Sequence, residues 1–287
     1  MLPKPFIQKL RRKPAVALVF EVLNRAGRHH ITSYAAALTY YTLFSVVPLL
    51  FFVLSVGSLF INAGEVEAVV LDSLTALLPT AADTIRVNIE SLVHHRGTMG
   101  VMSVLVALWS ASGMFTVLET AINVVWERDG GRTFWEQRLL GVLSLFGVTV
   151  WVLFAFLTRT LWQLLPHWFP IINGWEFPVS QWMERLLSFS IVFMLNFIVF
   201  RFFPAAEVHK RLSIGIGLLV SVVWVLVREA FALALTVGVL NYPLVYGSFW
   251  VAVVAIIWIN LSYHILLYGA EFQACLQERR EQGRKII

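Results

Sequence analysis

Long apolar runs, separated by polar segments, dominate the hydropathy pattern of the chain. Each run is long enough to cross a hydrocarbon core of about 30 Å at about 1.5 Å per residue. The apolar residues are continuous within a run, which favours helices over the alternating strands of a closed barrel. The pattern therefore predicts an all-α membrane protein with six transmembrane helices, at Tyr34–Ile61, Met99–Val125, Leu139–Leu165, Trp182–Phe203, Leu212–Leu240 and Gly247–Gln273.

Two amphipathic stretches lie outside these runs. Pro14 suits the first position of a helix, and apolar residues then repeat at helical spacing between basic flanks. This predicts an N-terminal interfacial helix on the cytoplasmic leaflet. In the alternative interpretation, the basic residues of this arm serve only to set the topology. In the first outward loop, Pro79 separates two apolar stripes. Thr80 and Asp83 then resemble a capping box, so we expect a periplasmic helical hairpin over residues 62–98.

Lys and Arg are concentrated on one side of the predicted membrane. Seventeen of the 22 lie in the N-terminal arm, the second and fourth loops and the C-terminal tail, four lie toward the other side, and Arg228 lies inside a span. Because cytoplasmic segments carry the excess of Lys and Arg, both termini are expected in the cytoplasm, in a bacterial inner membrane. We expect one polytopic membrane domain, 1–287, with a cytoplasmic arm over 1–33 and a cytoplasmic tail over 274–287.

Composition supports a membrane location and limits the chemistry. Hydrophobic residues make up 59% of the chain and charged residues 14%, against about 25% charged residues in soluble domains. Cys275 is the only cysteine, which excludes an intramolecular disulfide and a cysteine-cluster zinc site. There is no glycine-rich phosphate loop and no HExxH motif, and the three Asp residues are scattered. We therefore expect no cofactor, no metal site and no enzymatic activity.

Polar and ionisable residues inside apolar spans are costly and therefore mark candidate functional groups. In the functional interpretation they line a cavity open to the cytoplasm, where Arg228 holds an anion and His264 and Glu119 carry a proton. In the alternative, they form a hydrogen-bond network that only locks the helices together. Glu271 and the basic tail are expected at the solvated end of the last helix. The predicted cavity residues are Tyr41, Glu119, Asn123, Arg228, Glu229, Asn260 and His264.

Several motifs occur in an ordered series. YAAALTYYTLFSVVPLL runs from Tyr34 to Leu50, ALWSASGMFTVLETAINVVW occupies 107–126, and YGSFW at 246–250 is followed by YGAEF at 268–272. This series resembles the YihY/BrkB family of bacterial inner-membrane proteins, which usually continues the GAE motif with an aliphatic residue and Asn, where Phe272 and Gln273 stand here. The resemblance implies six spans and a link to envelope integrity and serum resistance. It also implies lipid or amphiphile transport, and it identifies the family's ribonuclease BN label as a misassignment.

Three functions follow as hypotheses. The leading one is a transporter or lipid-handling envelope protein, with membrane lipids as partners, a lipid or amphiphilic anion as substrate and, if it is energised, an ion gradient as the source. The alternative is a non-transporting structural or scaffold protein of the envelope. The least favoured is a ribonuclease for tRNA processing, since the basic residues suit topology and we expect no nucleic-acid partner. Rows of small residues, such as Ser213, Gly217 and Ser221, allow close helix packing and a homo-oligomer.

Overall fold

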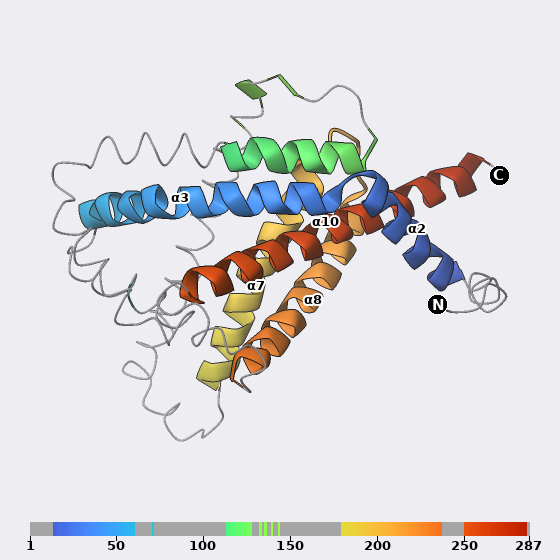
Figure 1. Cartoon of the computed structure of the whole chain (residues 1–287). Helices are drawn as coiled ribbons and strands as arrows, with labels where there is room; N and C mark the ends of the chain where they lie inside the picture. The colour runs from blue at the N-terminus through green and yellow to red at the C-terminus, as the bar shows by residue number, and fades with distance from the viewer. Residues whose placement is uncertain are drawn as a thin grey trace. The chain divides into compact units, whose positions relative to one another are not determined.

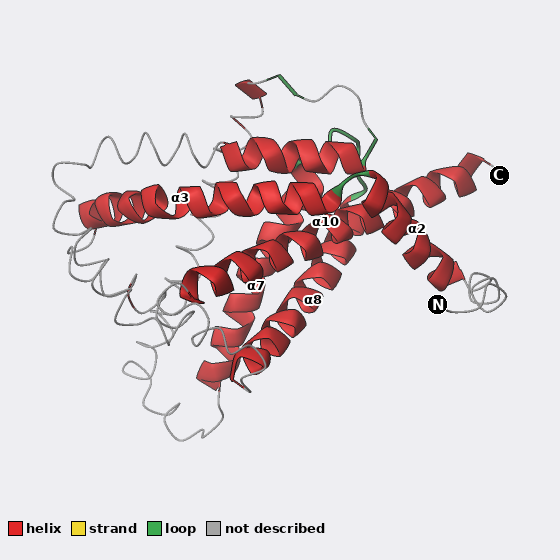
Figure 2. Ribbon diagram, viewed as in Figure 1, coloured by secondary structure: helices red, strands yellow, loops and turns green. Residues whose placement is uncertain are grey.

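The computed structural model describes residues 14–60, 113–127, 179–236 and 250–285, together with seven isolated positions between 71 and 143. These residues form helices joined by turns, and no strand occurs among them (Figure 2). The chain divides into two compact units. One unit comprises Met1–Thr32, Glu119–Thr236 and His264–Ile287, and the other comprises Ser33–Leu118 and Val237–Tyr263. The all-α prediction is therefore confirmed for the described residues.

Helix α2 (Pro14–Arg28) begins at the predicted proline, and a two-residue turn separates it from α3 (Ile31–Phe60). The N–H of His29 donates to the carbonyl of Arg25 at 2.8 Å, which continues the helical bonding into the turn. His30 has a φ of 51°. It is therefore a residue other than glycine in the left-handed backbone conformation that ends many helices. The predicted first span, Tyr34–Ile61, lies within α3 except for its last residue.

Helices α7 (Val179–Phe202) and α8 (Lys210–Thr236) lie side by side (Figure 1). The predicted row of small residues on α8 lies at their interface. Ser213 and Ser221 are fully buried, and the backbone of Phe197 lies 3.6 Å from where a side chain at Gly217 would begin. In addition, Nδ2 of Asn196 on α7 donates to Oγ of Ser221 at 3.0 Å. Small residues thus let the two helices approach closely, as predicted.

Helix α10 (Trp250–Lys285) continues well beyond Gln273, where the last predicted span ends. Its C-terminal part is covered by α2, because Leu18 and Val22 form a core cluster with Cys275. The expectation that Glu271 lies at a solvated helix end is wrong, since its exposed fraction is 0%. The physical reason is the packing of α2, which removes this part of α10 from solvent.

Close packing on the other side of α10 depends on Gly269. A Cβ atom there would overlap Cγ2 of Val220 on α8 and would lie 3.0 Å from the ring of Phe200 on α7. Glycine is therefore required for the approach of α10 to the α7–α8 pair. This glycine belongs to the YGAEF motif, which also contains Glu271. The motif therefore has a packing role at Gly269.

Two helices among the described residues are long and apolar enough to cross a membrane, Lys210–Leu235 and Ala252–Gln282. Only 11% and 17% of their most apolar windows are buried, whereas a core helix of a soluble protein would be mostly covered. The exposed apolar surface on these helices is what a lipid environment would cover. Apart from the isolated positions 71, 139 and 143, the third predicted span, Leu139–Leu165, and the predicted periplasmic hairpin over 62–98 lie outside the described residues.

Candidate functional site

A buried ion-pair network joins α2 to α10. Arg25, with an exposed fraction of 5%, donates through Nη1 to Glu278 at 2.6 Å, and its Nε lies 3.4 Å from Oε2 of Glu271. Nη2 of Arg25 also donates to the carbonyl of Val125 at 3.3 Å, at the C-terminal end of the helix Gly113–Val125. An arginine at this position satisfies a helix-end carbonyl and opposes the negative end of the helix dipole. One side chain therefore ties three helical segments together.

His29 and Glu127 complete this network. Nδ1 of His29 forms a short hydrogen bond with Oε1 of Glu271, and its Nε2 lies 3.3 Å from Oε1 of Glu127. Glu127 also lies 3.5 Å from Arg25, and it adopts a left-handed φ of 48°. A bulky residue in this conformation is strained unless its surroundings hold it there. Here the two basic partners, Arg25 and His29, hold its carboxylate.

The charges around Arg25 determine its protonation. Burial opposes the charged form, but the hydrogen bond that Arg25 donates to Glu278 and the negative groups nearby, Glu278 and Glu271 among them, raise the pKa of Arg25 above its ordinary value. Arg25 therefore stays charged at every physiological pH. Buried charges inside a low-dielectric region persist only when they are paired, and Arg25 meets this condition through several partners.

A second buried carboxylate, Glu119, lies in the same unit. Its Oε1 accepts from Nη1 of Arg132 at 3.3 Å, while Oε2 is buried and has no hydrogen-bond partner. Arg132 also donates to the carbonyls of Phe202 and Phe203 at 2.9 and 3.3 Å, so it caps the end of α7. One turn after Glu119, Oδ1 of Asn123 accepts from the N–H of Ala205 at 2.9 Å. Glu119 and Asn123 thus both face the α7–α8 connection.

The other unit contains a separate polar group. Nδ2 of Asn260 donates to Oγ1 of Thr39 at 3.2 Å, and Oγ1 of Thr42 shares a 2.5 Å hydrogen bond with the hydroxyl of Tyr263. The ring of Tyr41 covers Gly113, since a Cβ atom at that glycine would lie 3.1 Å from it. Tyr41 and Asn260, both predicted cavity residues, are therefore placed among polar and aromatic neighbours on α3 and α10.

Arg228 and Glu229 lie on an exposed face of α8. Their side chains are 44% and 61% exposed, and Nη2 of Arg228 donates to Oε1 of Glu229 at 2.6 Å. The guanidinium also lies 5.9 Å from the ring centroid of Trp224, within the range of a cation–π contact. His264 lies beside Tyr268 on α10, with ring centroids 6.3 Å apart. The seven predicted residues are thus distributed over several local groups, and a common cavity stays a prediction.

Comparison with known proteins gives the family of the chain. A family model described as Virulence factor BrkB matches residues 22–286, from within α2 to the end of α10. The chain belongs to the BrkB family. The resemblance inferred from the ordered motifs is therefore confirmed.

Relatives of this BrkB-family chain extend over most of its length. A UPF0761 membrane protein of Alteromonas mediterranea is 25% identical over 91% of this chain and 88% of its own length. A UPF0761 membrane protein of Psychromonas ingrahamii is 27% identical over 91% and 88%. A Bacillus subtilis protein, named ribonuclease-like protein YfkH, is 24% identical over 91% and 95%. No solved structure matches the chain. The family and its relatives identify a membrane protein.

Sequence reasoning identified the buried Glu119 of this BrkB-family chain but missed the network around Arg25. Arg25 was counted among the basic residues of the N-terminal arm, Glu271 was expected at a solvated helix end and His29 was not singled out, yet the three residues form one network. One signal pointed to Glu271, because it lies in the YGAEF motif and continues the polar stripe of α10. No signal within α2 distinguished Arg25 from its basic neighbours. Only the packing of α2 on α10 distinguishes Arg25 from these neighbours.

Proposed function

We propose that this BrkB-family protein is a six-span protein of the bacterial inner membrane, with both termini in the cytoplasm, that moves or handles an amphiphilic anion. The proposed topology includes the periplasmic hairpin over residues 62–98. Its support is the unequal distribution of Lys and Arg along the chain together with the apolar runs. Membrane lipids are the expected partners, and an ion gradient is the proposed source of energy.

The observation that carries the proposal is the state of Glu119. It is fully buried beside a helix connection, and only one of its two carboxylate oxygens has a hydrogen-bond partner. Ionisable groups within membrane helices are expensive, and they often mark proton or ion pathways. A carboxylate with one oxygen held by an arginine and the other unoccupied is suited to accepting and releasing a proton. We therefore assign the coupling step to Glu119.

The test uses purified protein in vesicles that contain phosphatidylglycerol labelled with a fluorophore on its headgroup side. Movement of the probe between leaflets is measured by its loss of accessibility to dithionite, with and without an imposed pH gradient. We expect the wild-type protein to move the probe faster under the gradient, and Glu119→Gln to abolish this response. Glu207→Gln is the matched control, because Glu207 is an exposed carboxylate of the same unit.

Two results would count against this function. If the wild-type protein moves neither labelled phosphatidylglycerol nor labelled phosphatidylethanolamine between leaflets, the lipid-moving proposal fails. If both lipids move but Glu119→Gln responds to the gradient like wild type, the coupling role of Glu119 fails. Circular dichroism and size-exclusion profiles of the two Gln variants establish that each is folded.

The ion-pair network supports a second candidate, a structural protein of the envelope. Arg25 bridges α2, α10 and the end of the helix Gly113–Val125, which is the arrangement expected of a fixed joint. In that case the buried charges hold the fold and carry no ion. Variants at Glu119 and Arg25 would then change stability alone. A ribonuclease activity has the least support, since only the printed name of a relative suggests it.

A further inference from the structure

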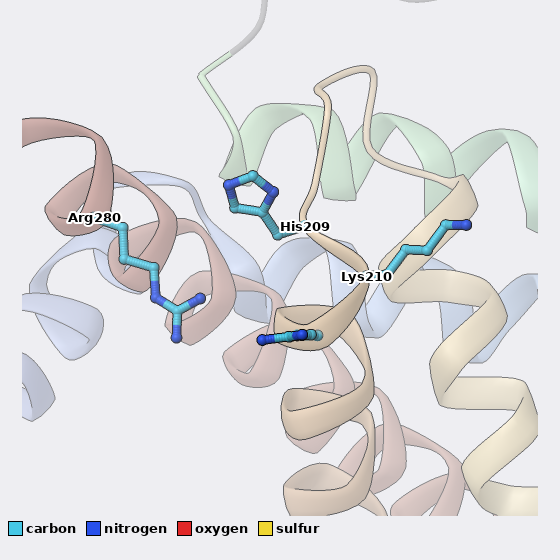
Figure 3. Close-up of a pocket in the computed structure, with 4 residues that line it drawn as sticks. His209, Lys210 and Arg280 are labelled. Atoms are coloured by element: carbon cyan, nitrogen blue, oxygen red, sulfur yellow. The ribbon is translucent and has the colours of Figure 1, made fainter. Parts of the chain in front are cut away.

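A basic cavity lies where α8 begins. It has a volume of about 340 Å³ and is lined by His209, Lys210, Arg211 and Arg280. Three of these residues come from the start of α8 and the residue before it, and the fourth comes from α10. Figure 3 shows the side chain of His209 on the side of Arg280, whereas the side chain of Lys210 extends away from both. The cavity therefore combines three consecutive residues at the start of α8 with Arg280, which only the tertiary structure brings to them.

The positive charges of this basic cavity are not neutralised by the described residues. Lys210, Arg211 and Arg280 are exposed, and none of them takes part in an ion pair within the described ranges. Three permanent positive charges around one cavity repel each other. A bound anion would remove that repulsion.

The position of the basic cavity adds to its preference for anions. It lies at the N-terminus of α8, a helix of 27 residues, where unpaired N–H groups and the helix dipole favour negative charge. The same helix end begins the apolar segment Lys210–Leu235. A site at the end of a membrane-crossing helix lies at the depth of lipid headgroups, where basic residues attract anionic lipids.

We propose that the basic cavity binds a phosphate group. The phosphate belongs either to an anionic lipid headgroup or to a soluble phosphate compound, and Arg211 and Arg280 hold its oxygens through charge-assisted hydrogen bonds. The structure describes no residue of the transport hypothesis in this cavity. The site is therefore independent of the proposed function, and it would serve a scaffold protein equally well.

The experiment measures binding of phosphatidylglycerol by native mass spectrometry of the full-length protein in detergent micelles. Phosphatidylcholine, which has no net charge, gives the baseline. The test variant is the double substitution Arg211→Gln with Arg280→Gln. The matched control is Arg28→Gln with Arg279→Gln, which removes the same net charge from exposed residues of the same unit, outside the basic cavity.

We expect the test variant to bind phosphatidylglycerol at least about tenfold more weakly than wild type, because two charge-assisted contacts are lost. The control variant also loses the ion pair between Arg279 and Glu21, which lies outside the basic cavity, so we expect its binding of phosphatidylglycerol to change by less than about threefold. Equal losses in the two double variants would overturn the proposal, because a diffuse surface attraction would then explain the binding. Unchanged binding in the test variant would overturn it as well.

A second arm distinguishes the source of the phosphate. Inorganic phosphate at millimolar concentration is added to the protein with and without phosphatidylglycerol, and the thermal midpoint is followed. If phosphate alone raises the midpoint of wild type but not of the test variant, and displaces the lipid, the site takes a soluble phosphate compound. If only the lipid stabilises the protein, the site takes a headgroup. If neither stabilises it, the proposal is wrong.

Discussion

Replacing Arg25 with Met tests whether the ion-pair network stabilises the fold. Arg25 is almost fully buried, whereas two of its acidic partners, Glu127 and Glu278, have side chains 55% and 40% exposed. Those two carboxylates regain water when Arg25 is removed. Glu271, with an exposed fraction of 0%, cannot do so and keeps only His29. The loss of unfolding free energy in Arg25→Met therefore comes from one buried carboxylate, Glu271, that is left partly unpaired.

The magnitude follows from this imbalance. Removing one partner of a buried ion pair costs about 3–5 kcal/mol, and the remaining contact from His29 to Glu271 places Arg25→Met at the low end, about 3 kcal/mol. The double variant Arg25→Met with Glu271→Met removes both charges, and we expect it to lose only about 1 kcal/mol. The double variant should therefore be about 2 kcal/mol more stable than Arg25→Met alone, as expected when two residues belong to one network.

The assay is equilibrium unfolding in mixed micelles with increasing sodium dodecyl sulfate, followed by circular dichroism. Arg28→Met is the matched control, because Arg28 lies on the exposed side of the same helix, and exposed substitutions change stability by about 0.5 kcal/mol or less. A loss at Arg25 no larger than the loss at Arg28 would refute the reasoning. A double variant that is less stable than Arg25→Met would refute it too.

The pH dependence of the Arg25 contribution also has a definite sign. Neighbouring acids raise the pKa of Arg25 in the folded state, so its stabilising contribution is complete at any pH below the ordinary pKa of arginine and is lost only as the pH rises above it. The difference in unfolding free energy between wild type and Arg25→Met should therefore be constant between pH 7 and pH 9. A strong change over that interval would mean that another group titrates with it.

Three further predictions concern helix packing and helix ends. Gly269→Ala should cost about 1–3 kcal/mol, because the new methyl group overlaps α8; Gly215→Ala, where a Cβ meets no atom within 4 Å, should cost nothing in the same unfolding assay. Asn196→Leu should lose about 0.6 kcal/mol and at most about 1.7 kcal/mol, the range for hydrogen bonds between membrane helices, and no further loss should follow when Ser221→Ala is added, since the bond is already absent. His30→Gly should raise the unfolding free energy by roughly 1 kcal/mol, because it relieves a left-handed conformation; a decrease would show that the His30 side chain makes a stabilising contact.

The sequence alone determined where the described helices lie and which family the chain belongs to. The predicted span Trp182–Phe203 differs from α7 by three residues at one end and one at the other, and the predicted start of the N-terminal helix at Pro14 is confirmed. The physical reason is that these properties are local. An apolar run of sufficient length must form a helix in lipid, and a proline fixes the first turn regardless of what lies nearby.

Only the tertiary structure decided which charges are buried. Arg25 and Glu278 are 253 positions apart, and His29 and Glu271 are 242 positions apart, so no periodicity along the chain could pair them. Conversely, Arg228 and Glu229 lie inside an apolar run but on an exposed face of α8, where they pair with each other. Burial depends on which helix covers a residue, and the covering helix α2 comes from the opposite end of the chain.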